Sequence, residues 1–190
     1  YPFYLVNGRV PSDPESFVAR AGDRIRLRII NAAADTVFTV AFGGHDLVVT
    51  HSDGYPVQPV ATPSLRIGMG ERYDAAVTLM DGVFALVAAP EGKAGLGRAL
   101  VRTGSGSVPP ASARPAEVAA YPLTVDALRA AESARLPERD PDTVQDVLLS
   151  GSMAPYVWTI NGTTYQDTIP LVIREGESGR LSIRNMSMMS

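Results

Sequence analysis

Few side chains in this sequence could bind a metal or act as a nucleophile. The 190 residues include two histidines, His45 and His51, and no cysteine. Without a thiol there is no disulfide, zinc–cysteine site, iron–sulfur cluster or cysteine nucleophile, and a type 1 copper site, which needs a thiolate, cannot be completed. On an extended strand the two histidines would lie roughly 20 Å apart. We interpret His45 as a turn residue after Gly43-Gly44 and His51 as a strand-end residue, with a place on an interdomain surface as the alternative.

The other candidates for chemistry have structural interpretations. The segment 68–74, GMGERYD, lacks the Gly-Lys-Ser/Thr of a phosphate loop, and its Tyr73 is typical of a residue that anchors a corner of a Greek-key sandwich. The methionines Met186, Met188 and Met189 would fill gaps in a core or, alternatively, lie beside a copper-handling region. No spacing typical of a catalytic pair or a nucleophile elbow is found among the acids Asp46, Asp53, Glu71 and Asp74 or the serines Ser64, Ser105 and Ser107. We therefore assign no catalytic, cofactor-binding or metal-binding residue.

Charge and hydropathy exclude further classes of function. The chain has 17 basic and 20 acidic residues and a net charge of −3, and Lys93 is its only lysine, so no positive field favours nucleic acid. Apolar residues make up 45% of the chain, which is ample for a buried core. No apolar run approaches the roughly 20 residues of a membrane-spanning helix. The opening YPFYLVNG has neither an initiator Met nor a signal-peptide pattern, so we expect a piece of a longer protein.

Short strands separated by turns predict an antiparallel sandwich or barrel as far as about Thr103. The clearest strand is Arg24–Ile29, where three arginines alternate with apolar residues. We expect further strands at 37–42, 46–50, 73–79 and 83–88, and a two-residue hairpin turn at Asp81-Gly82. Beyond the sandwich the sequence predicts a linker over 104–115 (GSGSVPPASARP), one short helix over Thr124–Ala134 with Thr124 as its N-cap, and a strand over Gln145–Leu149.

An internal repeat is the strongest pattern in the sequence. When the chain is shifted by 154 positions, Tyr4–Asn31 aligns with Trp158–Asn185 without a gap, and the turn residues coincide. The first copy continues for about 70 residues, whereas the second ends five residues later. We therefore expect one nearly whole β-domain, a linker and the first part of a second domain of the same kind. That first part cannot bury its own sheet face unaided.

Five segments together resemble the middle cupredoxin domain of three-domain multicopper oxidases, and the laccase-like bacterial branch is the most similar. The resemblance runs from Tyr1 to about Arg102 and resumes over Tyr156–Ser190, which is similar to the opening of the third domain. The segments that carry it are 4–9 (YLVNGR), 22–31 (GDRIRLRIIN), 44–47 (GHDL), 51–54 (HSDG) and 68–74 (GMGERYD).

The resemblance implies a fold and a domain organisation. The fold class would be all-β, with a cupredoxin-like Greek-key β-sandwich over residues 1–104 and a linker with one short helix over 105–153. Residues 154–190 would be the truncated start of a second cupredoxin-like domain. The implied partners are the other cupredoxin domains of the same parent, with a homo-oligomer as a further option, no nucleic acid and no membrane span. The implied location is exported: periplasmic, cell-surface or secreted.

The same resemblance implies a copper-dependent oxidase as the parent. A type 1 copper takes single electrons from a substrate, and a trinuclear copper cluster reduces dioxygen to water. The ligands come from the first and third domains, so this chain would be a copper-free scaffold. In the family a His-Pro-x-His-x-His motif follows the segment that matches 180–190, and we expect histidine next in a longer parent. The substrate stays open among copper-resistance, metal-ion, laccase and nitrite-reductase relatives.

Two other interpretations remain open. A non-enzymatic, copper-less scaffold of the same fold, as in a cell-division protein of the superfamily, would bind a partner through its sandwich faces. An unrelated Greek-key adhesion domain is the third.

Overall fold

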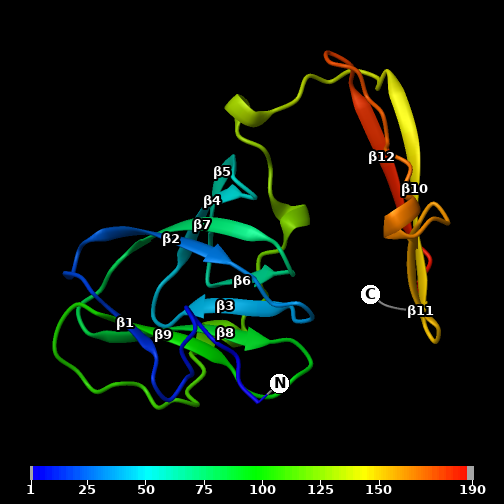
Figure 1. The fold of residues 1–190 in the computed structure, drawn as a ribbon. Coiled ribbons are helices and arrows are strands. Elements are labelled where there is room, and N and C mark those ends of the chain that lie inside the picture. Colours follow the sequence, from blue (N-terminus) through cyan, green and yellow to red (C-terminus); the bar gives the residue numbers. More distant parts are fainter. Residues whose placement is uncertain (1, 188–190) are drawn as a thin grey trace. The chain divides into compact units, whose positions relative to one another are not determined.

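The computed structural model describes residues 2–187 and consists of β-strands joined by turns and short 3₁₀ segments (Figure 1). The chain divides into two compact units: the first ends at Arg135 and the second begins at Leu136. No helix within the described residues has the length and apolar character that a bilayer crossing requires. The all-β class expected from the sequence is confirmed.

The first unit is a two-sheet β-sandwich. One sheet has the strand order β1-β9-β8-β3-β6 and the other has the order β2-β7-β4-β5. Every connection between consecutive strands crosses to the other sheet except β4–β5 and β8–β9, as expected for a Greek-key sandwich, and Figure 1 shows the two layers. The strands are β1 (Glu15–Val18), β2 (Arg24–Ile30), β3 (Phe38–Phe42), β4 (Leu47–Ser52), β5 (Tyr55–Thr62), β6 (Ser64–Ile67), β7 (Arg72–Thr78), β8 (Val83–Pro90) and β9 (Gly97–Arg102).

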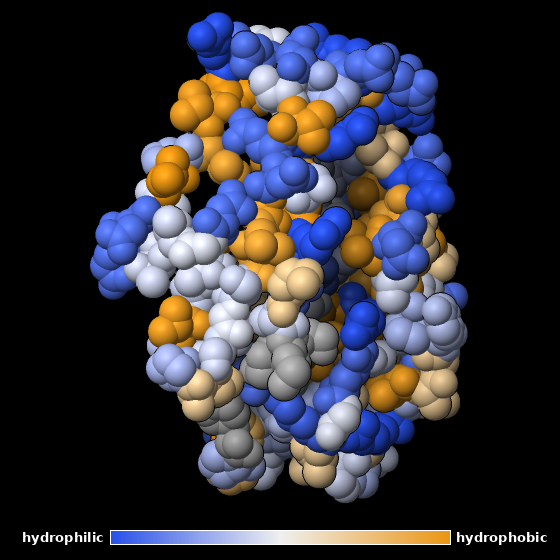
Figure 2. All heavy atoms as spheres, turned by 90° about the vertical axis from the view of Figure 1, so that its right-hand side faces the viewer, coloured by the Kyte–Doolittle hydropathy of each residue, from blue (hydrophilic) through white to orange (hydrophobic). Residues whose placement is uncertain are grey.

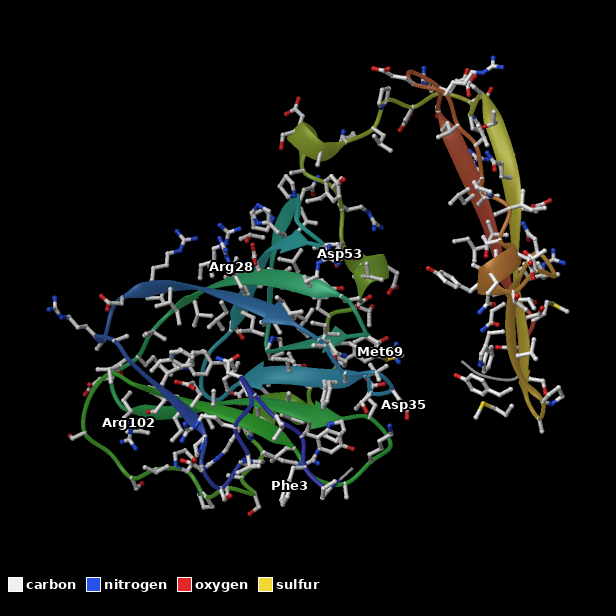
Figure 3. All side chains as sticks on the ribbon, viewed as in Figure 1. Phe3, Arg28, Asp35, Asp53, Met69 and Arg102 are labelled. Carbon is white, nitrogen blue, oxygen red and sulfur yellow. The ribbon has the colours of Figure 1, made fainter. Side chains whose placement is uncertain are left out.

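The core lies between these two sheets because successive residues of a strand face opposite sides. In β2 the arginines are exposed and the alternate apolar residues are half-buried, as the sequence predicts; Arg28 projects away from the sandwich interior in Figure 3. The largest fully buried side chains are Tyr73, Phe42, Leu47, Leu65 and Ile67. Burying side chains of this size stabilises the fold by about 1.5–3 kcal/mol each.

The prediction of a hairpin at Asp81-Gly82 is wrong, although the chain does turn there. Strands β7 and β8 flank it but belong to different sheets, so the chain crosses the sandwich at this point. Gly82 is held there because it bonds with Thr103 through both its N–H and its carbonyl. A two-residue hairpin forms instead at Asp53-Gly54, between the paired strands β4 and β5, where both residues have positive φ (50° and 89°).

The helix predicted over Thr124–Ala134 is also wrong. The structure has two 3₁₀ turns there, η2 (Val125–Ala127) and η3 (Glu132–Ala134), after an earlier one, η1 (Ala116–Ala119). Thr124 is the residue before η2, but its side chain does not cap that turn. The backbone pairs with strand edges instead: Leu123 bonds with Ser64 and Arg66, and Arg129 accepts from Gln58. Leu123 and Leu128 pack against the core, so tertiary contacts override a favourable helix propensity.

The second unit is a single three-stranded sheet of order β11-β10-β12. Its strands are β10 (Thr143–Met153), which contains the predicted strand 145–149, β11 (Tyr156–Ile160) and β12 (Gly179–Asn185), with a 3₁₀ turn η4 (Tyr165–Asp167). Of its described residues only Val147 is buried. Apolar side chains are visible among the hydrophilic ones on the face in Figure 2. In the second unit the exposed ones include Leu148, Ile160, Leu181 and Ile183.

The repeated segments share their local geometry. Asn7 and Asn161 have φ values of 50° and 51°, and the glycines that follow them have 79° and 80°. In each copy the residue three before the acid donates its N–H to that acid, over 2.9 Å at Asp23 and 3.0 Å at Glu177. One difference is clear. The segment that matches β1 is not a strand in the second unit, where no counterpart of β9 is present among the described residues to pair with it.

Candidate functional site

His45 is fully engaged in the structure of the first unit. It is buried, it stacks on Phe42 with ring centroids 4.3 Å apart, and Phe84 meets it edge-on. Its Nε2 accepts the Met80 N–H over 3.0 Å, which requires the proton to be on Nδ1, and Nδ1 then donates to the Gly43 carbonyl over 2.8 Å. Both ring nitrogens are therefore used, and the interpretation of His45 as a turn residue after Gly43-Gly44 is confirmed.

His51 is half-buried near the end of β4. The pairing of β4 with both of its neighbours shifts register between Val49 and His51, so the ladder is irregular just before His51. The Nδ1 of His51 lies 3.0 Å from the Thr50 hydroxyl. The expected strand-end position is confirmed, and its alternative, an interdomain role, stays a prediction.

The donor atoms of the described residues do not fit a copper site. Within residues 2–187 no three His, Cys, Asp or Glu side chains come together as a set that could hold a metal ion. The sequence has no thiolate donor, and both nitrogens of His45 already have partners. Met186 is exposed, whereas Met188 and Met189 lie outside the described residues.

Three of the short motifs meet at one hydrogen-bonded junction. In the turn between β6 and β7, Glu71 accepts the Gly68 N–H over 2.6 Å, and Gly70 donates its N–H to the Asn31 carbonyl. Arg72 follows Glu71 and donates its N–H to the carboxylate of Asp53, with the two side chains also forming an ion pair at 3.3 Å. The glycine-rich segment therefore uses its polar groups on its own fold and presents no phosphate cradle.

Asn31 is the residue at this junction that the sequence did not single out. It is 5% exposed; its Nδ2 donates to the carbonyls of Thr36 and Ile67, and its Oδ1 accepts the Ala33 N–H. These bonds close the end of β2 against β6. A buried asparagine after an apolar strand was the available sequence signal, but its partners, up to 36 residues away, were not readable.

Tyr73 is buried at the start of β7 and is 1% exposed. Among the described residues its hydroxyl has no hydrogen bond of good geometry, although the Ser52 side chain lies close by. Burial raises the pKa of this phenol, and the negative charge of Glu71 raises it further. Tyr73 is a core residue, and the hydroxyl contact that defines a tyrosine corner is absent from residues 2–187.

Arg98 on β9 is a second buried polar side chain that sequence analysis missed. Its Nε donates to the Pro11 carbonyl over 2.7 Å, and its Nη1 donates to the carbonyls of Pro109 and Pro110. Burial lowers the pKa of this guanidinium. The side chain ties the start of the predicted linker to the sandwich.

A groove of about 1170 Å³ opens along one side of the first unit. One wall is the N-terminal segment 3–8 and the other is β2 with Asn31. Phe3 on the first wall is labelled in Figure 3 and is 60% exposed. The floor is formed by core residues, among them Phe38, Val40, Leu86 and Val101. The lining is mostly apolar, and its charged residues are Arg26, Arg28 and Asp35.

Comparison with known proteins supplies the family. A family model described as multicopper oxidase matches residues 2–106. The chain belongs to the multicopper oxidase family. It is 50% identical over 189 residues to the multicopper oxidase MmcO of Mycobacterium tuberculosis, a match that covers 100% of this chain and 38% of that protein. It is 35% identical over 115 residues to a copper resistance protein A homolog of Pseudomonas syringae pv. tomato, covering 59% of this chain and 20% of the relative.

Solved structures agree on the fold. The laccase-like multicopper oxidase CueO from Ochrobactrum sp. matches with a TM-score of 0.64 at 21% identity, over 95% of this chain and 42% of that one. A multicopper oxidase from Campylobacter jejuni, described as a metallo-oxidase, matches with a TM-score of 0.60 at 16% identity, over 98% of this chain and 41% of that one. The cupredoxin-like sandwich is thus confirmed. The chain spans 38% of the length of MmcO and 20% of the length of the copper resistance protein A homolog.

Proposed function

We propose that this chain is the copper-free central part of a multicopper oxidase, whose parent oxidises its substrate in single-electron steps and reduces dioxygen to water. In this proposal the chain is a scaffold between the domains that carry the metal ligands. The observation that carries the proposal is the 50% identity to a multicopper oxidase along the whole chain. The two curated relatives named above are a multicopper oxidase and a copper resistance protein A homolog, so they do not favour the copper-less cell-division scaffold, which becomes one outcome of the test below.

The donor set supports the scaffold role. When bound, copper supplies the one-electron steps and the reduction of oxygen. The residues of this chain do other work: His45 holds the crossing between β3 and β4, and Glu71 and Asp53 hold the turn before β7. We therefore place the copper ligands outside this chain, in the neighbouring domains of the parent.

The proposed domain assignment follows the family order. Residues 1–104 would be the middle cupredoxin domain, 105–153 the linker and 154–190 the opening of the third domain. The matched turns of the repeat support a second domain of the same kind. The proposed linker contains the 3₁₀ turns of segment 116–134 and the strand β10. Its residues up to 135 belong to the first compact unit, and those from 136 onward belong to the second. Export from the cytoplasm remains a proposal, which a signal peptide in the full gene and cell fractionation would test.

The experiment uses the full-length parent and two histidine variants. The parent gene should encode His-Pro-x-His-x-His directly after Ser190 and a His-Cys-His run further on. Substitution of the first of these histidines by alanine should remove copper, measured by elemental analysis, and abolish oxygen consumption with a phenolic or cuprous substrate. The matched variant His51→Ala should keep its copper and change the oxidase rate by less than about twofold, because His51 lies outside the ligand set.

Either of two outcomes would overturn the proposal. A parent without these histidine motifs would be the copper-less scaffold. Loss of copper in His51→Ala, with folding retained by circular dichroism, would place a ligand inside this chain.

A further inference from the structure

The repeat exposes an asymmetry between the two units. In the second unit β10 is the central strand: β12 pairs with it in parallel on one side, and β11 pairs antiparallel on the other. Moved back by 154 positions, β12 corresponds to Ile25–Asn31 and β11 corresponds to Pro2–Val6. No described residue of the first unit occupies the place of β10. As a result β2 stands at the open edge of its sheet, and residues 2–5 form no strand.

The apolar groove lies in the place that the absent strand would fill. Its two walls, residues 3–8 and β2 with Asn31, are the elements that correspond to β11 and β12. A strand between them would pair with the unpaired edge of β2. Side chains opposite Leu27 and Ile29 would point to the sandwich interior, because directly paired residues share a face. The apolar floor suits such side chains.

Asn7 offers a second, independent match. Its counterpart Asn161 clamps β10 by accepting the Leu148 N–H at Oδ1 over 2.7 Å and donating from Nδ2 to the Asp146 carbonyl over 3.1 Å. Asn7 has the same backbone conformation, with a φ of 50°, and borders the same groove. Within the described part of the chain its amide makes no hydrogen bond and its side chain is exposed. The donor and acceptor that hold β10 in the second unit are therefore present and unused in the first.

We propose that the groove between residues 3–8 and β2 is an acceptor site for a β-strand, and that its occupant is the segment directly preceding Tyr1 in the longer parent. The choice of occupant follows from β10, an 11-residue strand that is joined to β11 by only Ala154-Pro155. The same offset puts the end of the incoming strand two residues before Tyr1, within reach of a tight turn. The strand runs parallel to β2, antiparallel to residues 2–6, and its backbone is held by the amide of Asn7.

The test compares hydrogen exchange in two forms of the chain. One is the 190-residue chain, and the other carries the roughly twelve parent residues that precede Tyr1, the length of β10 and one linking residue. We expect the extension to slow exchange of the outward-facing amides of Ile25–Asn31 on the order of tenfold or more. An extension of the same composition in scrambled order is the control, and it should give no such protection.

Matched asparagine variants test the clamp. Asn7→Ala should remove most of the protection that the extension gives to β2. Asn161→Ala should leave it intact and raise exchange at β10 instead. The proposal fails if the native extension protects no better than the scrambled one. It also fails if the unextended chain is already protected and sediments as a dimer, because a second copy would then fill the groove. None of these readouts depends on copper or oxidase activity, so they stand apart from the proposed function.

Discussion

At the scale of single residues, the side chains that were the strongest candidates for chemistry are hydrogen-bonded to main-chain groups of the fold. His45 forms hydrogen bonds with two main-chain groups, and the carboxylates of Glu71 and Asp53 each accept one main-chain N–H. The positions of these residues at turns could be predicted from the sequence, since Gly43-Gly44 and Asp53-Gly54 are typical turn residues. The partners could not, because Met80 lies 35 residues from His45 and Arg72 lies 19 from Asp53. Such polar groups stabilise a fold only when they are paired, which only the tertiary structure shows.

Tyr73 makes a residue-scale prediction about pH. A tyrosine ionises near pH 10 in an unfolded chain, and burial followed by the charge of Glu71 raises the pKa of Tyr73 above that value in the folded state. The folded state therefore keeps its proton where the unfolded state loses it. This contribution to stability is intact below about pH 10 and is lost as the pH rises through the folded pKa. We expect Tyr73→Phe to lessen the alkaline fall in the free energy of unfolding, measured by urea titration from about pH 9 to 11.

Neutral pH and an exposed tyrosine provide the controls. At pH 7, Tyr73→Phe should change the free energy of unfolding by less than about 1 kcal/mol, because the hydroxyl it removes makes no hydrogen bond of good geometry within residues 2–187. Tyr55→Phe, at a position that is 72% exposed, should leave the alkaline slope as it is. A loss of more than about 2 kcal/mol at pH 7 would mean that the hydroxyl has a strong partner.

At the scale of elements, period-two patterns predicted strands well and connections poorly. Residues 24–29, 37–42, 46–50, 73–79 and 83–88 all correspond to observed strands within one or two residues. The strands β1, β5, β6 and β9 were missed: β1 and β6 are short, β5 contains two prolines, and β9 lies among glycines and is buried without alternation. The predicted helix does not form, because leucines of this segment pack against the sandwich core and its backbone hydrogen-bonds to the edge strands β5 and β6. Local propensity carries no information on those contacts.

The repeat supplies a matched pair of leucines for an element-scale prediction. Leu27 in β2 packs against the core cluster, whereas Leu181 at the same repeat position in β12 is 53% exposed. We expect Leu27→Ala to lower the free energy of unfolding of the first unit by about 2 kcal/mol, since the side chain is only partly buried. Leu181→Ala should cost less than about 0.5 kcal/mol. Equal losses, measured by chemical denaturation of each unit, would show that the two strands are covered alike.

At the scale of the whole molecule, the family, the sandwich class and the repeat could all be inferred from motif order and spacing. What the sequence could not show is how unequally the two units are buried. The first has a core of Phe42, Leu47, Tyr73 and their neighbours between two sheets, whereas the second buries only Val147 among its described residues. Stability scales with the apolar surface that is removed from water. The two units should therefore differ widely in their resistance to unfolding.

This inequality predicts two unfolding transitions in urea. Trp158, the only tryptophan, lies in β11 and reports on the second unit, while far-UV circular dichroism reports on both. We expect Trp158 fluorescence to change at a lower urea concentration than the main circular-dichroism transition, which should also be steeper because the first unit exposes more surface. Leu27→Ala should move only the main transition. Gly151→Ala should move only the fluorescence transition, because the added Cβ would lie 2.3 Å from the Trp158 ring. Coincident transitions that shift together in both variants would show one cooperative unit and contradict the prediction.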